Sequence, residues 1–128
     1  MRPAGIVQAA LALILAATAI GSTAFARPAG PEPARKAYVL SEIMPHDRDA
    51  YRDYLQNVLP LIEQHGGRIV VSPFVPAKAV EGRALEGNLA IIEFPSPEAR
   101  DAFWNAPGYR PWKTLRQANA TSRIIHIN

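Results

Sequence analysis

The chain has 128 residues, and 14 lysines and arginines face 11 acidic residues, so its formal net charge is +3. It contains no cysteine, which excludes disulfide bonds and a lipid-modified cysteine. The basic residues are scattered among acids, whereas a nucleic-acid surface would concentrate them on one face. We therefore expect no nucleic-acid partner.

The N-terminus is predicted to be a secretory signal peptide, residues 1–26. A positive start precedes an unbroken apolar run at residues 9–17, and small residues flank the expected cleavage point before Arg27. The alternative is a membrane anchor, which needs about 20 predominantly apolar residues. Residues 4–20 nearly reach that length, but Gln8 interrupts their start. We expect cleavage, a periplasmic or secreted product of a bacterium, and no membrane association afterwards.

A linker and one domain are predicted to follow. Residues 27–36 contain three prolines and a glycine and have no periodic apolar pattern, which is typical of an extended or flexible linker. Residues 37–128 are then enough for a single domain with a modest core, which dimerisation would help to stabilise.

The domain is predicted to begin with a strand and a helix. Tyr38–Ile43 is a short β-prone run, and Asp47 is a plausible N-cap for the helix that follows. Apolar residues recur there at helical spacing, namely Tyr51, Tyr54, Leu55, Val58, Leu59 and Ile62. Pro60 should bend this helix. Gly66 and Gly67 should end it, one of them in the left-handed conformation.

Two further strands are predicted next, joined by a long loop. Arg68–Phe74 and Asn88–Phe94 are rich in β-branched and apolar residues. Residues 75–87 contain proline, two glycines and mixed charge, which indicates a loop.

The last third is predicted to be helical and to end in a strand. Ser96 is a capping residue and is followed by proline at the first helical position. Pro107-Gly108 should break this helix, and Tyr109–Ala120 should resume it. Thr121–Ile127 is predicted to be the last strand.

The order β-α-β-β-α-β predicts an α+β, ferredoxin-like fold with a four-stranded antiparallel sheet and both crossovers on one face. Strand alternation puts Leu89 and Ile91 on one face of the third strand and Ala90, Ile92 and Phe94 on the other. Because both faces are apolar and one layer of helices covers only one of them, we expect a symmetric homodimer that stacks sheet on sheet.

Several short motifs of the domain resemble the DUF1330 family, whose proteins are similar in fold to the dimeric α/β-barrel group. The motifs are Tyr54, the stretch from Pro60 ending in His65-Gly66-Gly67-Arg68, Glu81-Gly82, Ile91-Ile92-Glu93-Phe94-Pro95-Ser96, Pro107-Gly108-Tyr109 and Arg116. The resemblance covers most of residues 37–128. It implies a ferredoxin-like dimer and little about chemistry, because the family is named for an unknown function.

Glu93 is the most informative polar residue, because it shares a strand face with apolar neighbours. An unpaired carboxylate there would cost several kcal/mol after relaxation, about the penalty for burying one ion. Its candidate partners are Arg68 on the adjacent strand and Arg116 on the last helix, and Tyr54 and Tyr109 could add hydroxyl hydrogen bonds.

Three interpretations of Glu93 follow. It could form a buried pair with an arginine that fixes strand register or the dimer. It could line a polar pocket in which glutamate and arginine recognise a small ligand; the candidate ligand-binding residues are then Glu93, Arg68, Arg116, Tyr54 and Tyr109. It could also lie at the strand's end in solvent.

No catalytic motif is strong enough to name a reaction. The three histidines are far apart in the chain, so we expect no metal site, and no glycine-rich phosphate loop follows a strand into a helix, so we expect no nucleotide cofactor. The favoured hypothesis is a small exported dimer that binds a small molecule. The alternative is a cofactor-independent oxygenase or isomerase, by analogy of fold, with Glu93 or a tyrosine as acid/base and Arg68 or Arg116 stabilising an anion. A purely structural interaction partner is a third possibility.

Overall fold

The computed structural model describes residues 34–128, so the predicted signal peptide and the first part of the predicted linker lie outside the described residues. The elements follow in the order β1 (Ala37–Pro45), α1 (Arg48–Gln64), β2 (Arg68–Val71), β3 (Asn88–Phe94), α2 (Pro97–Asn105), α3 (Arg110–Asn119) and β4 (Ala120–Ile127). This confirms the predicted βαββαβ order, with its second helical segment divided at Pro107-Gly108. None of the helices between residues 34 and 128 has the length and apolarity to cross a membrane.

The four strands form one antiparallel sheet in the order β2-β3-β1-β4. The first and last strands of the chain are therefore neighbours, as in a ferredoxin-like fold. In the register, Leu40 pairs with Ile91 on one side and with Ile125 on the other. These three apolar side chains form a row across one face of the sheet.

The predicted helix ends are confirmed by their hydrogen bonds. The Asp47 side chain accepts from the backbone N–H groups of Asp49 and Ala50, at 2.9 and 3.0 Å, and so caps α1. The Ser96 hydroxyl accepts from the N–H of Ala99 and caps α2. Gly66, with φ +78°, takes the left-handed conformation just after α1.

The second strand is shorter than the sequence predicts. It was expected to run to Phe74 but ends at Val71, and its pairing with β3 is irregular between Ile69 and Val71. Pro73 has no N–H to donate to a ladder, so the strand cannot continue through it in a paired sheet. Residues 72–87 consequently form a long connection between β2 and β3.

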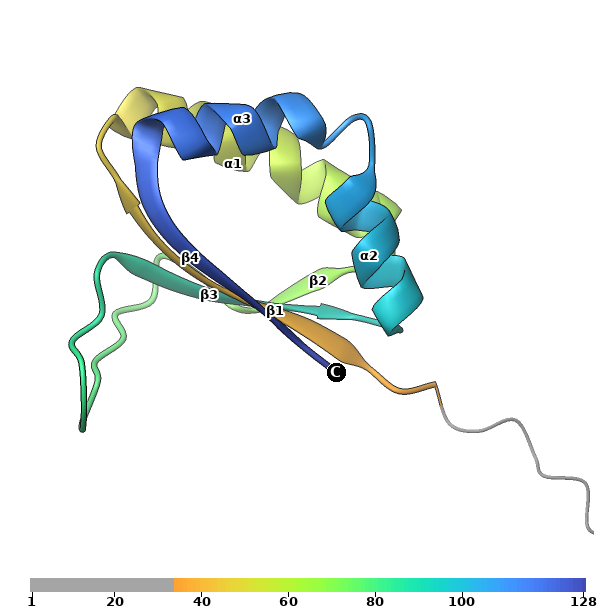
Figure 1. Ribbon diagram of the computed structural model, residues 1–128, viewed down its shortest axis with the longest axis horizontal. Coiled ribbons are helices and arrows are strands. Elements are labelled where there is room, and N and C mark those ends of the chain that lie inside the picture. The colour runs from red at the N-terminus through yellow and green to blue at the C-terminus, as the bar shows by residue number, and fades with distance from the viewer. Residues whose placement is uncertain (1–33) are drawn as a thin grey trace, which may run out of the picture.

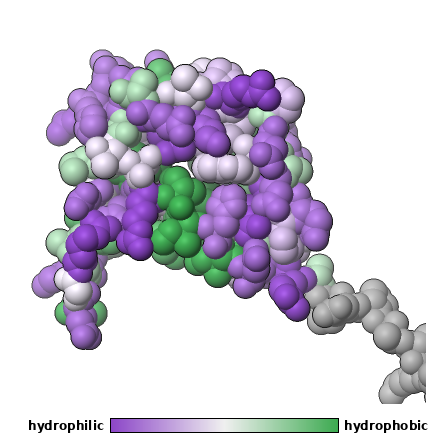
Figure 2. Space-filling view, viewed as in Figure 1, coloured by the Kyte–Doolittle hydropathy of each residue, from purple (hydrophilic) through white to green (hydrophobic). Residues whose placement is uncertain are grey.

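All three helices cover the same face of the sheet (Figure 1). The core lies between these two layers and consists of Val39, Ile43, Tyr54, Val58, Ile62, Ile92, Phe94, Phe103 and Tyr109. Seen from the side of β4 and α3, apolar side chains are visible between the helices and the sheet, framed by polar residues (Figure 2). We call this the inner face of the sheet, and the uncovered side the open face.

Candidate functional site

The five predicted ligand-binding residues divide between the two faces of the sheet. Glu93 lies on the open face with Arg68, because the pairing register joins these two residues directly. Tyr54 and Tyr109 belong to the core on the inner face, and Arg116 is the buried residue of α3. The structure therefore assembles two separate groups rather than one pocket.

Glu93 is held by an ion-pair network on the open face. Its carboxylate accepts from Lys36 Nζ at 3.1 Å, Arg68 Nε at 3.0 Å and the Tyr38 hydroxyl at 3.2 Å, and its side chain is 12% exposed. The hydrogen bond from Lys36, with further contributions from Arg68 and Tyr38, lowers the pKa of Glu93. The geometry therefore agrees with the interpretation of Glu93 as one member of an ion pair. Arg68 is a partner, as predicted, but the other contacts come from Lys36 and Tyr38 and not from Arg116, Tyr54 or Tyr109.

The two candidate tyrosines contact each other instead of Glu93. The hydroxyls of Tyr54, on α1, and Tyr109, at the start of α3, lie 3.4 Å apart in the core. Burial raises the pKa of the Tyr54 phenol well above its usual value, and the nearby Tyr109 raises it further. At neutral pH, the Tyr54 phenol consequently keeps its proton, so it can donate or accept a hydrogen bond but is not a base.

Arg116 is a buried cation with an incomplete set of partners. The residue is 4% exposed, and its Nη1 donates to the Ser122 hydroxyl on β4. Its Nε is buried without any hydrogen-bond partner, and no carboxylate of residues 34–128 forms an ion pair with it. A charge buried in this way costs several kcal/mol, roughly the effective penalty per buried ion. Its place in the last turn of α3 offsets part of that cost through the helix dipole, but supplies no acceptor for Nε.

A small cavity lies in the core between α1 and the sheet. Its volume is about 40 Å³, and it is lined by Ser41, Ile43, Tyr51, Tyr54, Leu55, Val58, Leu59, Ile62, Ile69, Pro73, Ala90 and Ile92. Ile43 pairs across the sheet with Ser122, the residue that receives the hydrogen bond from Arg116. The cavity has hydroxyl groups on otherwise apolar walls, and one of them, from Tyr54, lies near enough to Arg116 for the arginine's positive charge to lower the Tyr54 pKa slightly against the effect of burial.

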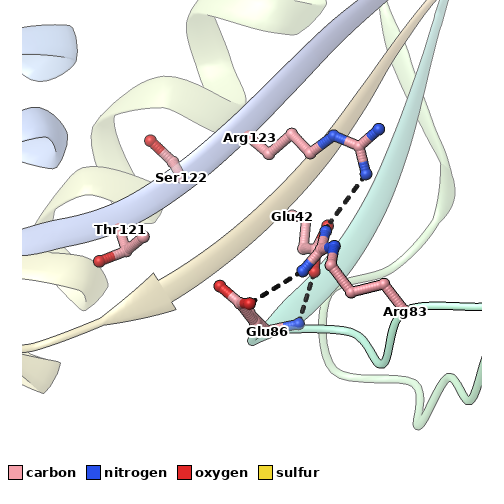
Figure 3. A pocket seen from close by; sticks show the side chains of 6 residues that line it. All are labelled: Glu42, Arg83, Glu86, Thr121, Ser122 and Arg123. Atoms are coloured by element: carbon pink, nitrogen blue, oxygen red, sulfur yellow. Dashed lines mark hydrogen bonds and ion pairs between the residues drawn. The ribbon is translucent and has the colours of Figure 1, made fainter.

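The sequence interpretation missed a second carboxylate on the open face, Glu42. Its side chain is 3% exposed and accepts from the backbone N–H of Glu86 and from Arg83 at 2.9 Å, while Arg123 lies 3.9 Å away (Figure 3). The hydrogen bond from Glu86, assisted by Arg83, lowers the pKa of Glu42. These residues line an open pocket of about 290 Å³ together with Thr121 and Ser122. The alternation that singled out Glu93 applies equally to Glu42, and could have identified it.

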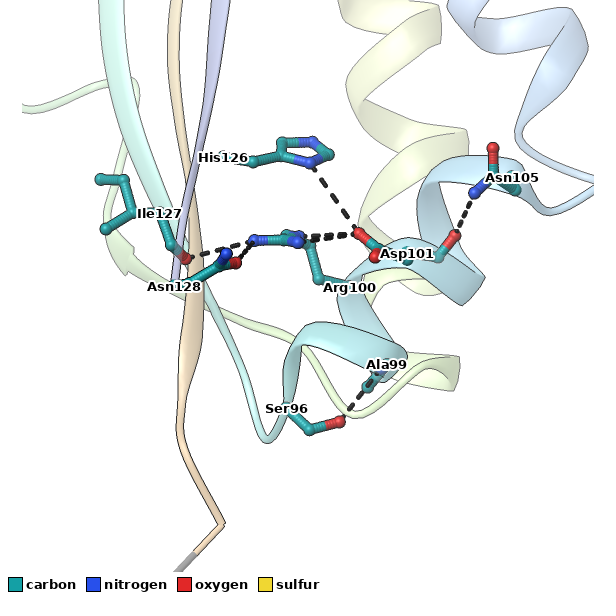
Figure 4. A network of polar contacts seen from close by, with 8 residues as sticks. All are labelled: Ser96, Ala99, Arg100, Asp101, Asn105, His126, Ile127 and Asn128. Carbon is teal, nitrogen blue, oxygen red and sulfur yellow. Dashed lines mark hydrogen bonds and ion pairs between the residues drawn. The ribbon is translucent and has the colours of Figure 1, made fainter.

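Arg100 on α2 is a second buried arginine that the sequence did not single out. Its guanidinium pairs with Asp101 at 2.9 Å and donates to the Asn128 side chain at 2.6 Å and to the Ile127 carbonyl at 3.3 Å (Figure 4). His126 lies beside this network, 3.9 Å from Asp101. Unlike Arg116, Arg100 has a carboxylate and further acceptors in contact.

The three histidines lie apart and have separate partners. His46 Nε2 is 2.8 Å from the Thr121 hydroxyl, and His65 Nδ1 is 2.7 Å from a carbonyl of its own helix. Among residues 34–128 there is no group of three or more histidine and acidic side chains placed to hold a metal ion.

The fold and these contacts define a ferredoxin-like α+β protein in which a buried cation of the described domain, Arg116, is incompletely partnered. The chain belongs to the DUF1330 family, described as a domain of unknown function, whose family model matches residues 36–128. Comparison with curated proteins gives no match.

Several solved structures share the fold. A protein of unknown function from Rhodopseudomonas palustris is 23% identical, with a TM-score of 0.55 over 72% of this chain and 80% of its own. SnoaB, a cofactor-independent oxygenase from Streptomyces nogalater, is 14% identical, with a TM-score of 0.51 over 74% of this chain and 93% of its own. A dimeric ferredoxin-like protein of unknown function from Jannaschia sp. is 12% identical, with a TM-score of 0.50 over 73% of this chain and 99% of its own. At these identities the likeness establishes the fold alone.

Proposed function

We propose that this protein is a homodimer that binds a small organic anion, a carboxylate, between the helix layer and the sheet, with Arg116 as the group that recognises the charge. One observation carries the proposal, namely that Arg116 is buried while, among residues 34–128, its Nε finds no acceptor and its charge no paired carboxylate. Buried polar groups in folded proteins are nearly always hydrogen-bonded, and exceptions call for an explanation such as a ligand. A carboxylate would supply both the missing acceptor and the missing charge.

The surroundings define the class of ligand. The hydroxyls of Tyr54 and Tyr109 lie 3.4 Å apart on the inner face, and the cavity of about 40 Å³ that Tyr54 lines has mostly apolar walls. A water molecule needs about 10–15 Å³ of such volume, so the cavity accommodates only a few non-hydrogen atoms. A short-chain monocarboxylate, with its charge at Arg116 and its carbon atoms in the cavity, fits this chemistry.

Binding is better supported than catalysis. The alternative, a cofactor-independent oxygenase or isomerase, needs an acid/base beside the anion-stabilising group. Glu93, the carboxylate considered for that role, lies on the open face and is paired with Lys36 and Arg68. The raised pKa of Tyr54 keeps its phenol protonated, so it is not a base at neutral pH. The likeness to SnoaB supports the alternative through the fold alone.

The dimer and the export are parts of the same proposal. The open face has an apolar row at Leu40, Ile91 and Ile125, and its burial against a second copy would remove that surface from water. A dimeric relative in fold supports this arrangement. The sequence before Arg27 has the layout of a signal peptide, so we propose that the mature chain begins near Arg27 and functions in the periplasm or outside the cell. N-terminal sequencing of the exported product tests this part, and a membrane-bound product that retains Met1 would contradict it.

Calorimetric titration of the full mature protein with sodium acetate tests the binding proposal. We expect saturable binding of acetate, no binding of methylammonium at equal ionic strength, and loss of acetate binding in Arg116→Met. Arg68→Met is the matched control, because it removes the same group on the open face and should keep acetate binding. Native mass spectrometry of the purified protein would further identify a retained carboxylate.

Three results would overturn the proposal. Absence of binding by acetate, propionate and formate to the wild type would remove its basis. Retention of acetate binding by Arg116→Met would place the anion elsewhere. Equal binding of methylammonium would show that the site does not select negative charge.

A further inference from the structure

The connection between β2 and β3, residues 72–87, is long and bears exposed apolar side chains. Phe74 is 74% exposed, Val75 57% and Val80 95%. Loops of more than about 12–15 residues without secondary structure are uncommon in compact domains and usually functional. Phe74 and Val75 border an open hollow with Leu55 and Leu59 of α1, and Val80 is almost fully exposed. Exposed apolar side chains gathered in one segment mark an interaction surface.

The returning arm of this loop is fixed to the sheet. Arg83 pairs with the Glu42 carboxylate at 2.9 Å, and the backbone N–H of Glu86 donates to the same carboxylate. Gly87 has φ +110°, and a Cβ on it would lie 2.2 Å from the Ile43 carbonyl oxygen, so the backbone passes directly against β1. The base of the loop is therefore held in place while its tip projects.

The loop of residues 72–87 projects on the side of the open face. Figure 1 shows the loop leaving the ends of β2 and β3 away from the helices, past the sheet. The open face beside it carries the apolar row Leu40, Ile91 and Ile125. A second sheet stacked on this face would lie about 10 Å away. A loop projecting on this side would then run alongside that second sheet.

We propose that residues 72–87 form an arm that clasps the second copy of this chain, with Phe74 and Val80 packing on the partner's surface. The inference rests on the proposed homodimer and adds to it the segment that contacts the partner outside the sheet. The occupant is a second copy because the arm and the apolar face lie on the same side. A two-fold axis would bring each arm over the other chain, which makes the contact self-complementary.

Sedimentation equilibrium of the wild type and single variants tests the arm. Phe74→Ser and Val80→Ser should each weaken dimerisation about tenfold, the factor that corresponds to about 1.4 kcal/mol of lost apolar burial. Lys78→Ser is the matched control in the same loop and should leave the dissociation constant unchanged. All three positions are exposed, so circular dichroism should show an unchanged fold.

A second measurement uses the absence of cysteine from the chain. The Val80→Cys variant therefore has a single thiol, at position 80. In the dimer, maleimide should label this thiol several-fold more slowly than in a monomeric reference, the double variant Val80→Cys with Ile125→Arg. The added charge of Ile125→Arg on the open face should give a folded monomer.

The outcomes separate the arm from the dimer. A monomeric wild type would overturn both. A dimeric wild type that Ile125→Arg dissociates, but that Phe74→Ser and Val80→Ser leave unchanged, would overturn the arm while the dimer stands. Equal labelling rates at Val80→Cys in dimer and monomer would also overturn the arm.

Discussion

Two buried arginines, Arg100 and Arg116, lie on the helices that cover the same sheet, and their surroundings are opposite. They are 5% and 4% exposed, respectively. Arg100 contacts Asp101, Asn128 and the Ile127 carbonyl, whereas among residues 34–128 Arg116 donates only to the Ser122 hydroxyl. A buried arginine can therefore stabilise the fold through its contacts, as Arg100 does, or keep a donor without an acceptor, as Arg116 does. An unsatisfied buried donor is what distinguishes a candidate binding site from a structural contact.

The largest expected effect is from Arg100→Met. This change leaves the Ile127 carbonyl and the Asn128 side chain without their donor, and hydrogen bonds to charged groups contribute about 1.5–3 kcal/mol to stability. We expect a loss of about 2 kcal/mol in the free energy of unfolding. Urea denaturation of the mature protein measures it. An unchanged midpoint would contradict the structural role of Arg100.

Arg116→Met should have a smaller effect, in the opposite direction. Because no carboxylate in the described part of the chain pairs with this arginine, its removal eliminates an uncompensated buried charge and retains most of the volume. We expect the ligand-free protein to be unchanged or more stable, by about 1 kcal/mol, the low end of the gain seen when buried ionic groups are replaced by apolar ones. The same urea measurement in acetate-free buffer checks this. A loss as large as that of Arg100→Met would show that Arg116 is structural.

The smallest expected effect is a change in the titration of His126. Burial lowers the pKa of His126, and the positive charge of Arg100 lowers it further. Arg100→Met should therefore raise this pKa, while Arg116→Met should leave it unchanged. Proton NMR titration of the His126 ring measures it, and equal shifts in both variants would remove the distinction between the two arginines.

The sign of the stability effect follows from the same pKa. The pKa of His126 in the folded protein lies below its unfolded value of about 6.5. Protonation consequently favours the unfolded state, and stability is lost as the pH falls from about 6.5 through the folded pKa. The dependence on pH in that window should be weaker in Arg100→Met than in the wild type.

The elements of the fold follow closely from local sequence signals. The predicted strand Asn88–Phe94 has the observed bounds, and Asp47 and Ser96 cap their helices as expected. Each of these signals acts within a few residues, which is why single-sequence reasoning finds them. The predicted length of β2 was wrong, because Pro73 and the irregular pairing before it end the strand before Phe74.

The candidate site could be predicted only in part. Glu93 and Arg68 were placed together because they lie on neighbouring strands, and the register pairs them. Arg116 was assigned to the same group, but it lies on α3, and the helices cover the face of Ile92 and Phe94 rather than that of Glu93. Strand alternation separates the two faces but does not say which of them the helices cover. Arg100 was overlooked because its partners are far away in sequence, at the end of β4.

The incomplete partnering of Arg116 is the central claim, and NMR spectra of the arginine Nε–H groups test it most directly. The wild-type protein would be titrated with sodium acetate against sodium chloride of equal ionic strength. The account predicts that the Arg116 Nε–H resonance moves to a hydrogen-bonded position and saturates, while the Arg100 resonance stays in place. An Arg116 resonance that does not respond to acetate, or that moves no more than that of Arg100, would contradict it.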